Sequence, residues 1–162
     1  MTATKVMVVD TNVWLDYLFG DRSRCADARD FLMQAVRTDT PLVIAPHCLS
    51  DVFFIFQQQL KLKNREGGMM SPDRAAASAR AAAWAALDFI LEYASVGPTD
   101  HMDALVASKH RAIHGDYEDN LVISCALRTE ARLLVTNDEK LIKHSPAPAM
   151  TAKDAAALLS LE

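Results

Sequence analysis

The sequence predicts an α/β fold, a three-layer α/β/α sandwich with a central, mostly parallel sheet of four to five strands. Short apolar runs alternate with longer segments of helical periodicity, which is typical of parallel sheets covered by helices on both faces. The length of 162 residues fits one domain, and 51% apolar with 23% charged residues is ordinary for a globular chain. We therefore expect residues 1–162 to form a single domain with a substantial core.

Short apolar runs, mostly of branched residues, predict the buried strands. These runs cover residues 6–9, 42–45, 94–96 and 133–136, and residues 149–151 could add a strand at the sheet edge. The carboxyl ends of parallel strands meet at one edge of a sheet, and ligands of such folds bind there. The residues that follow each strand therefore decide where a functional site can form.

The segments between the strands repeat apolar residues at helical spacing and carry helix-start residues. They predict helices over residues 11–18, 24–38, 49–62, 71–93, 101–110, 118–129, 138–143 and 153–161. Pro46 suits a first helical turn, and Thr151 is a candidate N-cap for the last helix. Residues 64–72 contain paired glycines and no periodicity, so we expect a loop there.

Composition also bounds the cellular setting. No run reaches the roughly 18 uninterrupted apolar residues of a membrane span, and the N-terminus lacks the features of a signal peptide. Cys25, Cys48 and Cys125 are odd in number and widely spaced, which predicts reduced thiols. We therefore expect a cytoplasmic protein.

The net charge of −4 argues against a nucleic-acid partner, because contacts to phosphate come from Lys and Arg. That argument reverses if the acidic residues are concentrated in a metal site, where a bound cation inverts the local sign. Five basic residues near predicted helix ends could steer phosphates, although exposed charges of this kind usually only favour solvation. They are Arg22, Arg24, Lys61, Lys63 and Arg65.

Five aspartates fall near the expected carboxyl ends of the strands. Asp10 closes the first strand, Asp51 lies in the first turns of the helix after the second, and Asp138 follows the fourth. Asp116 and Asp119 begin the helix that leads into the fourth strand. Carboxylate oxygens suit Mg²⁺ or Mn²⁺, and two such ions can support in-line hydrolysis of a phosphodiester. The pattern predicts a metal-dependent nuclease.

Helix capping is a competing explanation for each of these acids, because Asp is common at helix starts. Asp10 differs from the others, since a bare charge directly after four apolar residues of a central strand is costly. Such an acid needs a metal, a base or several N–H partners.

Four segments, in order, resemble the motifs of the PIN-domain family of ribonucleases, especially the VapC-like toxins of bacterial toxin–antitoxin pairs. The segments are Val8–Val13, Ala45–Val52, Gly115–Ala126 and Leu134–Leu141, and they span nearly the whole chain. The resemblance implies a Rossmann-like sandwich, dependence on Mg²⁺ or Mn²⁺, and single-stranded RNA as substrate. It also implies a homodimer and, for a toxin, inhibition by a protein antitoxin.

The resemblance also assigns roles to individual residues. The catalytic and metal-binding residues are expected to be Asp10, Asp51, Asp119 and Asp138. Asp116, three residues before Asp119, is a fifth candidate metal ligand. Asn12 and Thr136 are expected to orient these carboxylates, while Asn137 could instead contact a phosphate.

Two departures from the family pattern leave other function classes open. Asp51 stands where the family usually has the longer Glu, which could shift or weaken one metal position and is the only hint of a catalytically impaired PIN-fold binding module. Leu141 stands where an aromatic residue is common. A strand-end-Asp phosphohydrolase of another class is a further alternative. Haloacid-dehalogenase-like enzymes typically have a second Asp two residues after the first, and this chain has Asn12 there.

Histidines and one further acid have competing interpretations. His110 and His114, like His47 and Asp51, have the spacing of two zinc ligands on a helix. Solvent-exposed histidines at helix ends are the favoured interpretation, because no third ligand completes a site. Asp103 is interpreted as a surface or first-turn acid.

The aromatic residues are expected to serve packing. Phe53, Phe54 and Phe56 are residue types that stack on nucleic-acid bases, but their place in a predicted helix favours the core or a dimer face. Trp14 and Trp84 are expected to be packing residues as well.

Overall fold

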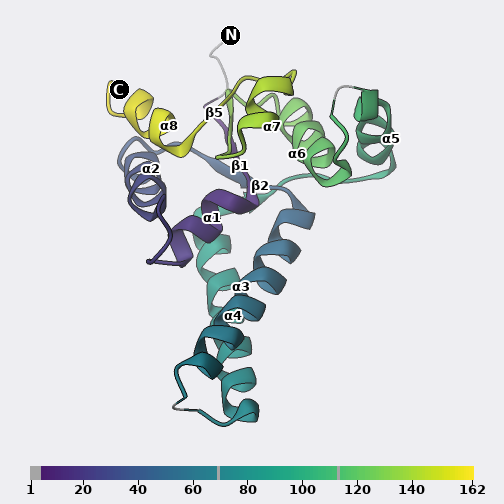
Figure 1. The fold of residues 1–162 in the computed structure, drawn as a ribbon. Coiled ribbons are helices and arrows are strands. Elements are labelled where there is room, and N and C mark those ends of the chain that lie inside the picture. The colour runs from purple at the N-terminus through teal and green to yellow at the C-terminus, as the bar shows by residue number, and fades with distance from the viewer. Residues whose placement is uncertain (1–4, 69, 113) are drawn as a thin grey trace.

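A parallel β-sheet forms the centre of the molecule (Figure 1). The computed structural model describes residues 5–68, 70–112 and 114–162, and within them five strands lie in the order β3-β2-β1-β4-β5. The strands are β1 (Met7–Val9), β2 (Leu42–Ile44), β3 (Ala94–Val96), β4 (Leu133–Val135) and β5 (Ala149–Met150). All neighbouring pairs are parallel, which confirms the predicted fold class.

The strand order reverses at β1, the central strand. Val8 of β1 is paired with Val43 of β2 on one side and with Leu134 of β4 on the other. All residues of β1 are fully buried, as its uninterrupted apolar run predicts. In sheets of this kind, ligands bind where the order reverses, outside the carboxyl ends of the strands. The fold therefore directs attention to the residues that follow β1 and β4.

Helices flank the sheet, and their positions follow the predicted segments closely. They are α1 (Thr11–Leu18), α2 (Cys25–Arg37), α3 (Pro46–Glu66), α4 (Pro72–Tyr93), α5 (His101–Lys109), η1 (His110–Ala112), α6 (Tyr117–Arg128), α7 (Glu139–His144) and α8 (Ala152–Leu159). Pro46 occupies the first turn of α3, and the Thr151 hydroxyl caps α8, both as expected.

One boundary was predicted wrongly. The loop expected at residues 64–72 begins only at Gly67, because α3 continues through its polar last turn to Glu66. The Gly67 N–H donates to the Lys63 carbonyl at 3.0 Å, which keeps the helical hydrogen-bond pattern to that point. Position 69, within the expected loop, lies outside the described residues.

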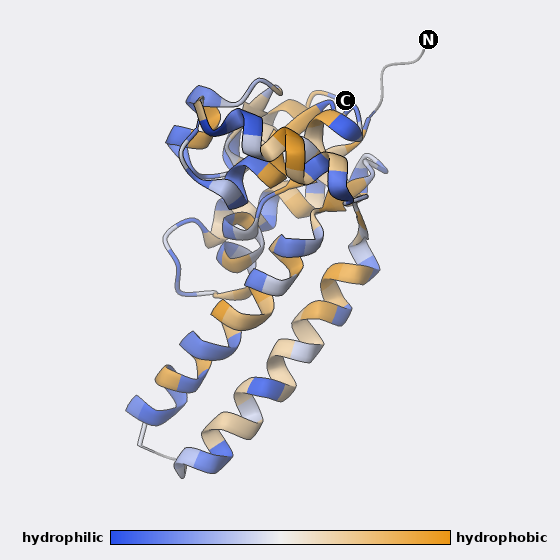
Figure 2. Cartoon of the chain, turned by 90° about the vertical axis from the view of Figure 1, so that its right-hand side faces the viewer, coloured by the Kyte–Doolittle hydropathy of each residue, from blue (hydrophilic) through white to orange (hydrophobic). Residues whose placement is uncertain are grey.

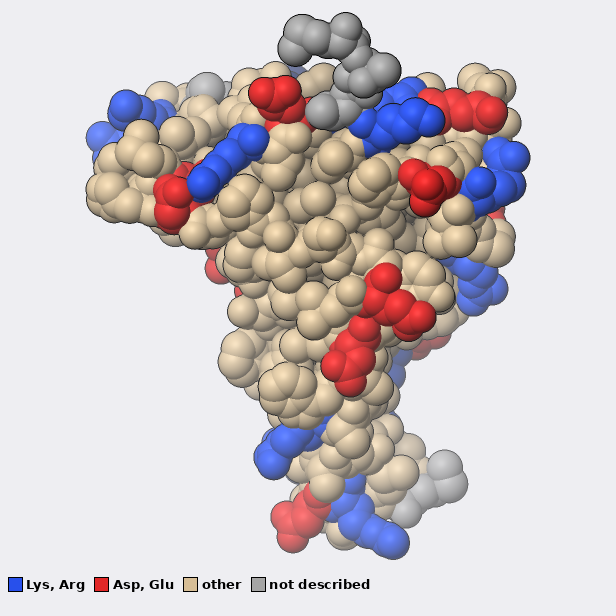
Figure 3. All heavy atoms as spheres, turned by 180° about the vertical axis from the view of Figure 1, so that it is seen from behind, with Lys and Arg blue, Asp and Glu red and all other residues tan. Residues whose placement is uncertain are grey.

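Helices α3 and α4 form a long hairpin that extends away from the sheet (Figures 1 and 2). Small side chains recur along the buried face of α4, where Ala75, Ala79, Ala83 and Ala86 precede Ile90. This spacing allows the two helix backbones to approach closely. On the rear face, Lys and Arg side chains gather at the rim of the upper body and at the free end of the hairpin (Figure 3).

Two further expectations concern the residues that the structure describes. None of their helices is long and apolar enough to cross a membrane. Cys25, Cys48 and Cys125 are buried free thiols, as their spacing predicts.

Candidate active site

Asp10 lies at the carboxyl end of β1 and is only 5% exposed. Its Oδ1 accepts a hydrogen bond of 2.7 Å from the Thr11 N–H, so Asp10 is the N-cap of α1. Its Oδ2 accepts bonds from Asn12 Nδ2 at 2.6 Å and from Thr136 Oγ1 at 2.7 Å. The buried carboxylate thus has the several donors that its sequence position demands, and Asn12 and Thr136 are in direct contact with it.

The segment after β4 is tied to the same carboxylate. Asn12 Oδ1 accepts a bond from the Asn137 N–H at 2.8 Å, and Thr136 Oγ1 accepts one from the Asp138 N–H at 3.1 Å. The side-chain amide of Asn137 donates to Asp16 at 2.9 Å, and its oxygen accepts from the first residue of α8. Asn137 therefore connects α1, α8 and the β4 end, and its amide is engaged within the protein.

A pocket of about 270 Å³ opens beside Asp10. Asp51 of α3 and Asp119 of α6 line it together with Asp10, so three of the four predicted catalytic acids meet there. Asp138 and Asp116 line an adjoining depression of about 420 Å³, which also contains Asp119. Asp119 therefore joins the two hollows.

Burial and repulsion between neighbouring acids raise the pKa of two carboxylates, those of Asp10 and Asp119. Burial raises the pKa of Asp10, and the charge of Asp138 raises it further, whereas the hydrogen bond from Thr136 lowers it. Burial, followed by the charges of Asp10 and Asp116, raises the pKa of Asp119 to about 6. The pKa of Asp119 is also raised by the charge of Asp138. Asp10, Asp116, Asp119 and Asp138 therefore form one electrostatically coupled group, called the inner group below.

Asp51 belongs to a second group on another wall of the pocket. Burial raises the pKa of Asp51, the neighbouring charge of Glu118 raises it further, and His47 lowers it. Glu118 and His47 also line the pocket, although neither is among the site residues expected from the sequence. The only sequence signal for Glu118 is its position directly before Asp119 in an acidic run.

Two aspartates cap helices and also line the candidate site. Asp116 caps α6 and Asp138 caps α7, as the competing explanation proposed. Each cap uses Oδ1 alone, at 2.9 Å from the Glu118 N–H and at 2.7 Å from the Lys140 N–H. Among the described residues, the hydrogen bonds leave Oδ2 of both aspartates without a donor. Each carboxylate thus keeps one oxygen for another ligand.

The donor set fits Mg²⁺ or Mn²⁺ better than zinc. Within residues 5–68, 70–112 and 114–162, no three His, Cys, Asp or Glu side chains converge closely enough to enclose an ion. Structural zinc sites are closed tetrahedral shells, whereas Mg²⁺ keeps several waters and takes one or two carboxylates plus substrate phosphates. An open lining of carboxylates that repel one another therefore suits a hard, hydrated cation.

Two predictions about polar side chains need correction. His114 was expected to be exposed, but its side chain is 11% exposed and its Nε2 lies 3.4 Å from Asp119 Oδ2. Asp103 is a first-turn acid in a capping box of α5, yet it is buried rather than on the surface. Its carboxylate accepts hydrogen bonds from Arg128 and Ser124 of α6 because α5 packs directly on that helix.

The aromatic residues divide between core and surface. Phe56 and Trp14 are buried, as expected for packing residues. Phe54 and Trp84 are 64% and 56% exposed, so neither is a core residue and the expectation that Trp84 packs in the interior is wrong; both rings contact Phe53 edge-on. Leu141 is fully buried, so the departure from the family pattern at this position is accommodated by packing.

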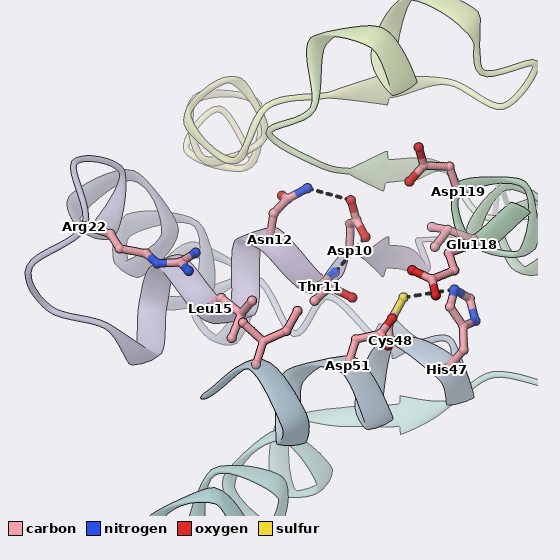
Figure 4. A pocket seen from close by; sticks show the side chains of 12 residues that line it. Asp10, Thr11, Asn12, Leu15, Arg22, His47, Cys48, Asp51, Glu118 and Asp119 are labelled. Atoms are coloured by element: carbon pink, nitrogen blue, oxygen red, sulfur yellow. Dashed lines mark hydrogen bonds between the residues drawn. The ribbon is translucent and has the colours of Figure 1, made fainter. Parts of the chain in front are cut away.

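Figure 4 shows how charge is distributed along the pocket. Asp10, Glu118 and Asp119 lie toward one end of the view, and Arg22 lies at the other (Figure 4). The arrangement can hold a divalent cation at the acidic end and an anionic group between the two ends. Arg22, named in the sequence only among general basic residues, is part of the pocket wall.

Comparisons with known proteins agree with the fold. The family model of the PIN domain matches residues 6–140, a span that contains all five aspartates. The crystal structure of PAE2754 from Pyrobaculum aerophilum is similar, with a TM-score of 0.60, 16% identity and 99% of each chain covered. VapBC2 from Rickettsia felis, solved bound to a DNA fragment from its promoter, has a TM-score of 0.56 at 15% identity, covering 90% of this chain and 98% of that one. A search of curated proteins found no match.

Proposed function

The chain belongs to the PIN-domain family, and from this premise we propose that it is a Mg²⁺- or Mn²⁺-dependent endoribonuclease acting on single-stranded RNA. The observation that carries the proposal is the electrostatic coupling of three acids where the strand order reverses: the charge of Asp138 raises the pKa of both Asp10 and Asp119. Their mutual repulsion is a cost that the fold bears in the absence of a cation. A divalent cation would remove that cost.

The proposed roles follow from the contacts. Asp10, Asp119 and Asp138, with Asp116 beside them, would hold the cation directly or through water. When bound, the cation supplies charge stabilisation for the phosphodiester oxygens and activates water for attack. Thr136 and Asn12 fix the direction of the Asp10 carboxylate by donating to its Oδ2.

Asp51 and Glu118 would act as a second pair of carboxylates on the facing wall. Asp51 is one methylene shorter than the usual Glu of the family, but Glu118 of α6 is close enough to raise its pKa. We propose that Glu118 supplies the reach that Asp51 lacks. This compensation supports an active enzyme over an impaired binding module.

A strand-end-Asp phosphohydrolase of another class is less well supported. In such an enzyme the residue at position 12 would be a second acid, whereas here Asn12 donates to Asp10 through its amide. Both oxygens of Asp10 already accept hydrogen bonds, which suits a fixed metal ligand better than an attacking nucleophile.

The test is Asp10→Asn assayed on single-stranded RNA with Mg²⁺ and, separately, with Mn²⁺. Asn keeps the side-chain shape and the capping oxygen but removes the charge, so cleavage should fall to the level of the wild type in EDTA. Asp30→Asn, at an exposed position of α2, is the matched control and should cleave normally. Undiminished cleavage by Asp10→Asn would overturn the proposal. A melting temperature that Mg²⁺ and Mn²⁺ leave unchanged would favour the binding module.

We also propose that the chain is the toxin of a toxin–antitoxin pair. The support is the structural likeness to VapBC2, together with an apolar groove of about 400 Å³ between α1, α2 and α4. Met33 and Val36 line this groove and are more than half exposed. A small reading frame adjacent to this one should encode a protein that suppresses cleavage. Met33→Glu should weaken that suppression, whereas Met102→Glu on α5 should not.

A homodimer is proposed on separate grounds. Phe54, Leu62 and Trp84 are exposed on the α3–α4 hairpin, and large apolar side chains at a surface favour association. Light scattering should give twice the chain mass for the wild type and a single chain mass for Trp84→Arg. A monomeric wild type at micromolar concentration would overturn this assignment.

A further inference from the structure

Arg22 provides the positive charge of the active-site pocket. Among the residues that line it in the described part of the chain, Arg22 is the only Lys or Arg. We propose that Arg22 binds a phosphate of the RNA strand adjacent to the phosphate that is cleaved. This inference rests on the proposed ribonuclease function and assigns it a substrate contact.

The Arg22 side chain is held in place by three partners. Its Nη1 donates to Asp16 Oδ1 at 3.2 Å, and its Nη2 donates to Gln59 Oε1 of α3 at 3.1 Å. The guanidinium carbon lies 5.1 Å from the centroid of the Phe19 ring. The Arg22 side chain is 29% exposed and the Asp16 side chain 11%. A guanidinium fixed on several sides loses little further freedom when it binds an anion.

Donors remain for a ligand. A guanidinium has five N–H groups, and Asp16 and Gln59 use one each. The others can form the paired hydrogen bonds that make Arg suited to phosphate. Lys63, another basic residue near this end of α3, is instead paired with Asp21.

The partner of Arg22 also belongs to the framework around Asp10. Asp16 accepts from the amide of Asn137, whose N–H donates to Asn12, which in turn donates to Asp10. A continuous chain of hydrogen bonds therefore fixes the position of the guanidinium relative to the acidic end. This gives a role to the Asn137 amide and to the largely buried Asp16 carboxylate.

The separation of charge indicates which phosphate Arg22 would bind. The cleaved phosphate must lie beside the carboxylates and their cation, at the end of the pocket opposite Arg22 (Figure 4). A neighbouring phosphate of the same strand could lie near Arg22, where its negative charge is farther from those acids. For a chain of net charge −4, one fixed cation inside the pocket is an effective way to attract the strand.

The first experiment measures binding without cleavage. In the Asp10→Asn background, the affinity for a single-stranded RNA oligonucleotide is measured over a range of KCl concentrations in the presence of Mg²⁺. Loss of one phosphate contact should reduce the slope of log K against log[salt] by about 0.7. Arg22→Ala should show this reduction. Arg74→Ala, the same charge change at an exposed position of α4 outside this pocket, should keep the slope of the Asp10→Asn background.

The second experiment locates the phosphate. A single uncharged methylphosphonate linkage is moved along the oligonucleotide on both sides of the cleaved bond. One adjacent position should weaken binding to the wild-type pocket about tenfold, the order expected for one charged hydrogen-bond contact. Arg22→Ala should bind that RNA no more weakly than unmodified RNA. Arg22→Lys should retain the salt slope but bind more weakly than wild type, because it keeps the charge and loses the paired geometry.

The outcomes separate this inference from the proposed function. If the wild type cleaves RNA but Arg22→Ala retains both the KM and the salt slope, Arg22 only anchors the turn after α1 and the inference is wrong. If the wild type cleaves no RNA under any metal condition, the proposed function fails instead. A lower melting temperature for Arg22→Ala would show that Arg22 also anchors the fold. The methylphosphonate series is then measured on Arg22→Lys. Weaker binding at the same adjacent position would support the phosphate contact, and equal binding at every position would exclude it.

Discussion

The hydroxyl of Thr136 lies 2.7 Å from Oδ2 of Asp10 and joins two residues that are 126 positions apart in the chain. It also accepts a hydrogen bond from the Asp138 N–H, so one buried hydroxyl connects the acids that follow β1 and β4. The relative position of these two carboxylates therefore depends on a neutral side chain between them.

Thr136→Val should keep the shape of this side chain and remove the link. Asp10 would lose one of the donors that lower its pKa, so metal affinity and kcat/KM for RNA should fall about 10- to 100-fold. Loss of the buried hydrogen bond should cost about 1–2 kcal/mol in the free energy of unfolding. Steady-state kinetics and urea unfolding measure the two effects. Thr136→Ser, which restores the hydroxyl, should recover most activity, and an equally inactive Ser variant would contradict this account.

Without metal, the protein should become less stable as pH rises toward neutrality. Asp119 titrates at about 6 in the folded protein and near 3.8 in its ordinary state, so the folded protein binds more protons between these values. Stability therefore falls as pH rises through this window. In EDTA, the melting temperature should be higher at pH 5.5 than at pH 7.5.

Asp119→Asn should flatten this pH dependence, and Mn²⁺ should raise the melting temperature more at pH 7.5 than at pH 5.5. Asp30→Asn, at an exposed position of α2, is the control and should behave as the wild type. A wild-type melting temperature that rises with pH in EDTA would contradict the proposed repulsion among the inner carboxylates.

Asp51 and Glu118 should behave as a coupled pair. Asp51→Asn and Glu118→Gln should each reduce kcat/KM, and less than Asp10→Asn does, because both lie outside the inner group. If Glu118 supplies the reach that Asp51 lacks, the double variant should differ from the sum of the single effects by about 0.5–3 kcal/mol. A double-mutant cycle on kcat/KM measures this coupling, and strictly additive effects would remove the proposed compensation.

The contact between α5 and α6 should depend on Arg128. This residue pairs with the buried Asp103 and with Asp100, and these bonds raise the pKa of Arg128. Arg128→Ala would leave the buried Asp103 carboxylate without its cationic partner, so the midpoint of urea unfolding should fall. Adding Asp103→Asn should recover part of the loss. Arg132→Ala, which breaks the more exposed pair with Glu162, should cost less than about 1 kcal/mol.

The sheet and its acids were predictable because their signals are local. A run of buried apolar residues such as Met7–Val9 is typical of a central strand. The acid that follows it must then be paired with hydrogen-bond donors or a cation. Asp138 follows the same logic, since it begins a helix shortly after β4.

Other parts of the site depend on packing between distant segments. Glu118 reaches the pocket because α6 lies across from α3, and Arg22 does so because Gln59 and Asp16 hold it there. Nothing in the local sequence distinguishes Arg22 from Arg24, yet of the two only Arg22 lines the pocket beside Asp10. His114 likewise contacts the ring of His144, which lies thirty residues further along the chain on α7.

Three of the site aspartates also begin helices. Their two roles, as helix caps and as site acids, limit which substitutions the protein can accept in evolution. Asp10, Asp116 and Asp138 each cap a helix with one oxygen. Replacement by Ala would lose both the charge and the cap, whereas Asn caps helices about as well as Asp. An inactive descendant that kept the fold for regulation would therefore arise most readily by Asp-to-Asn exchange, leaving the architecture intact after the chemistry has gone.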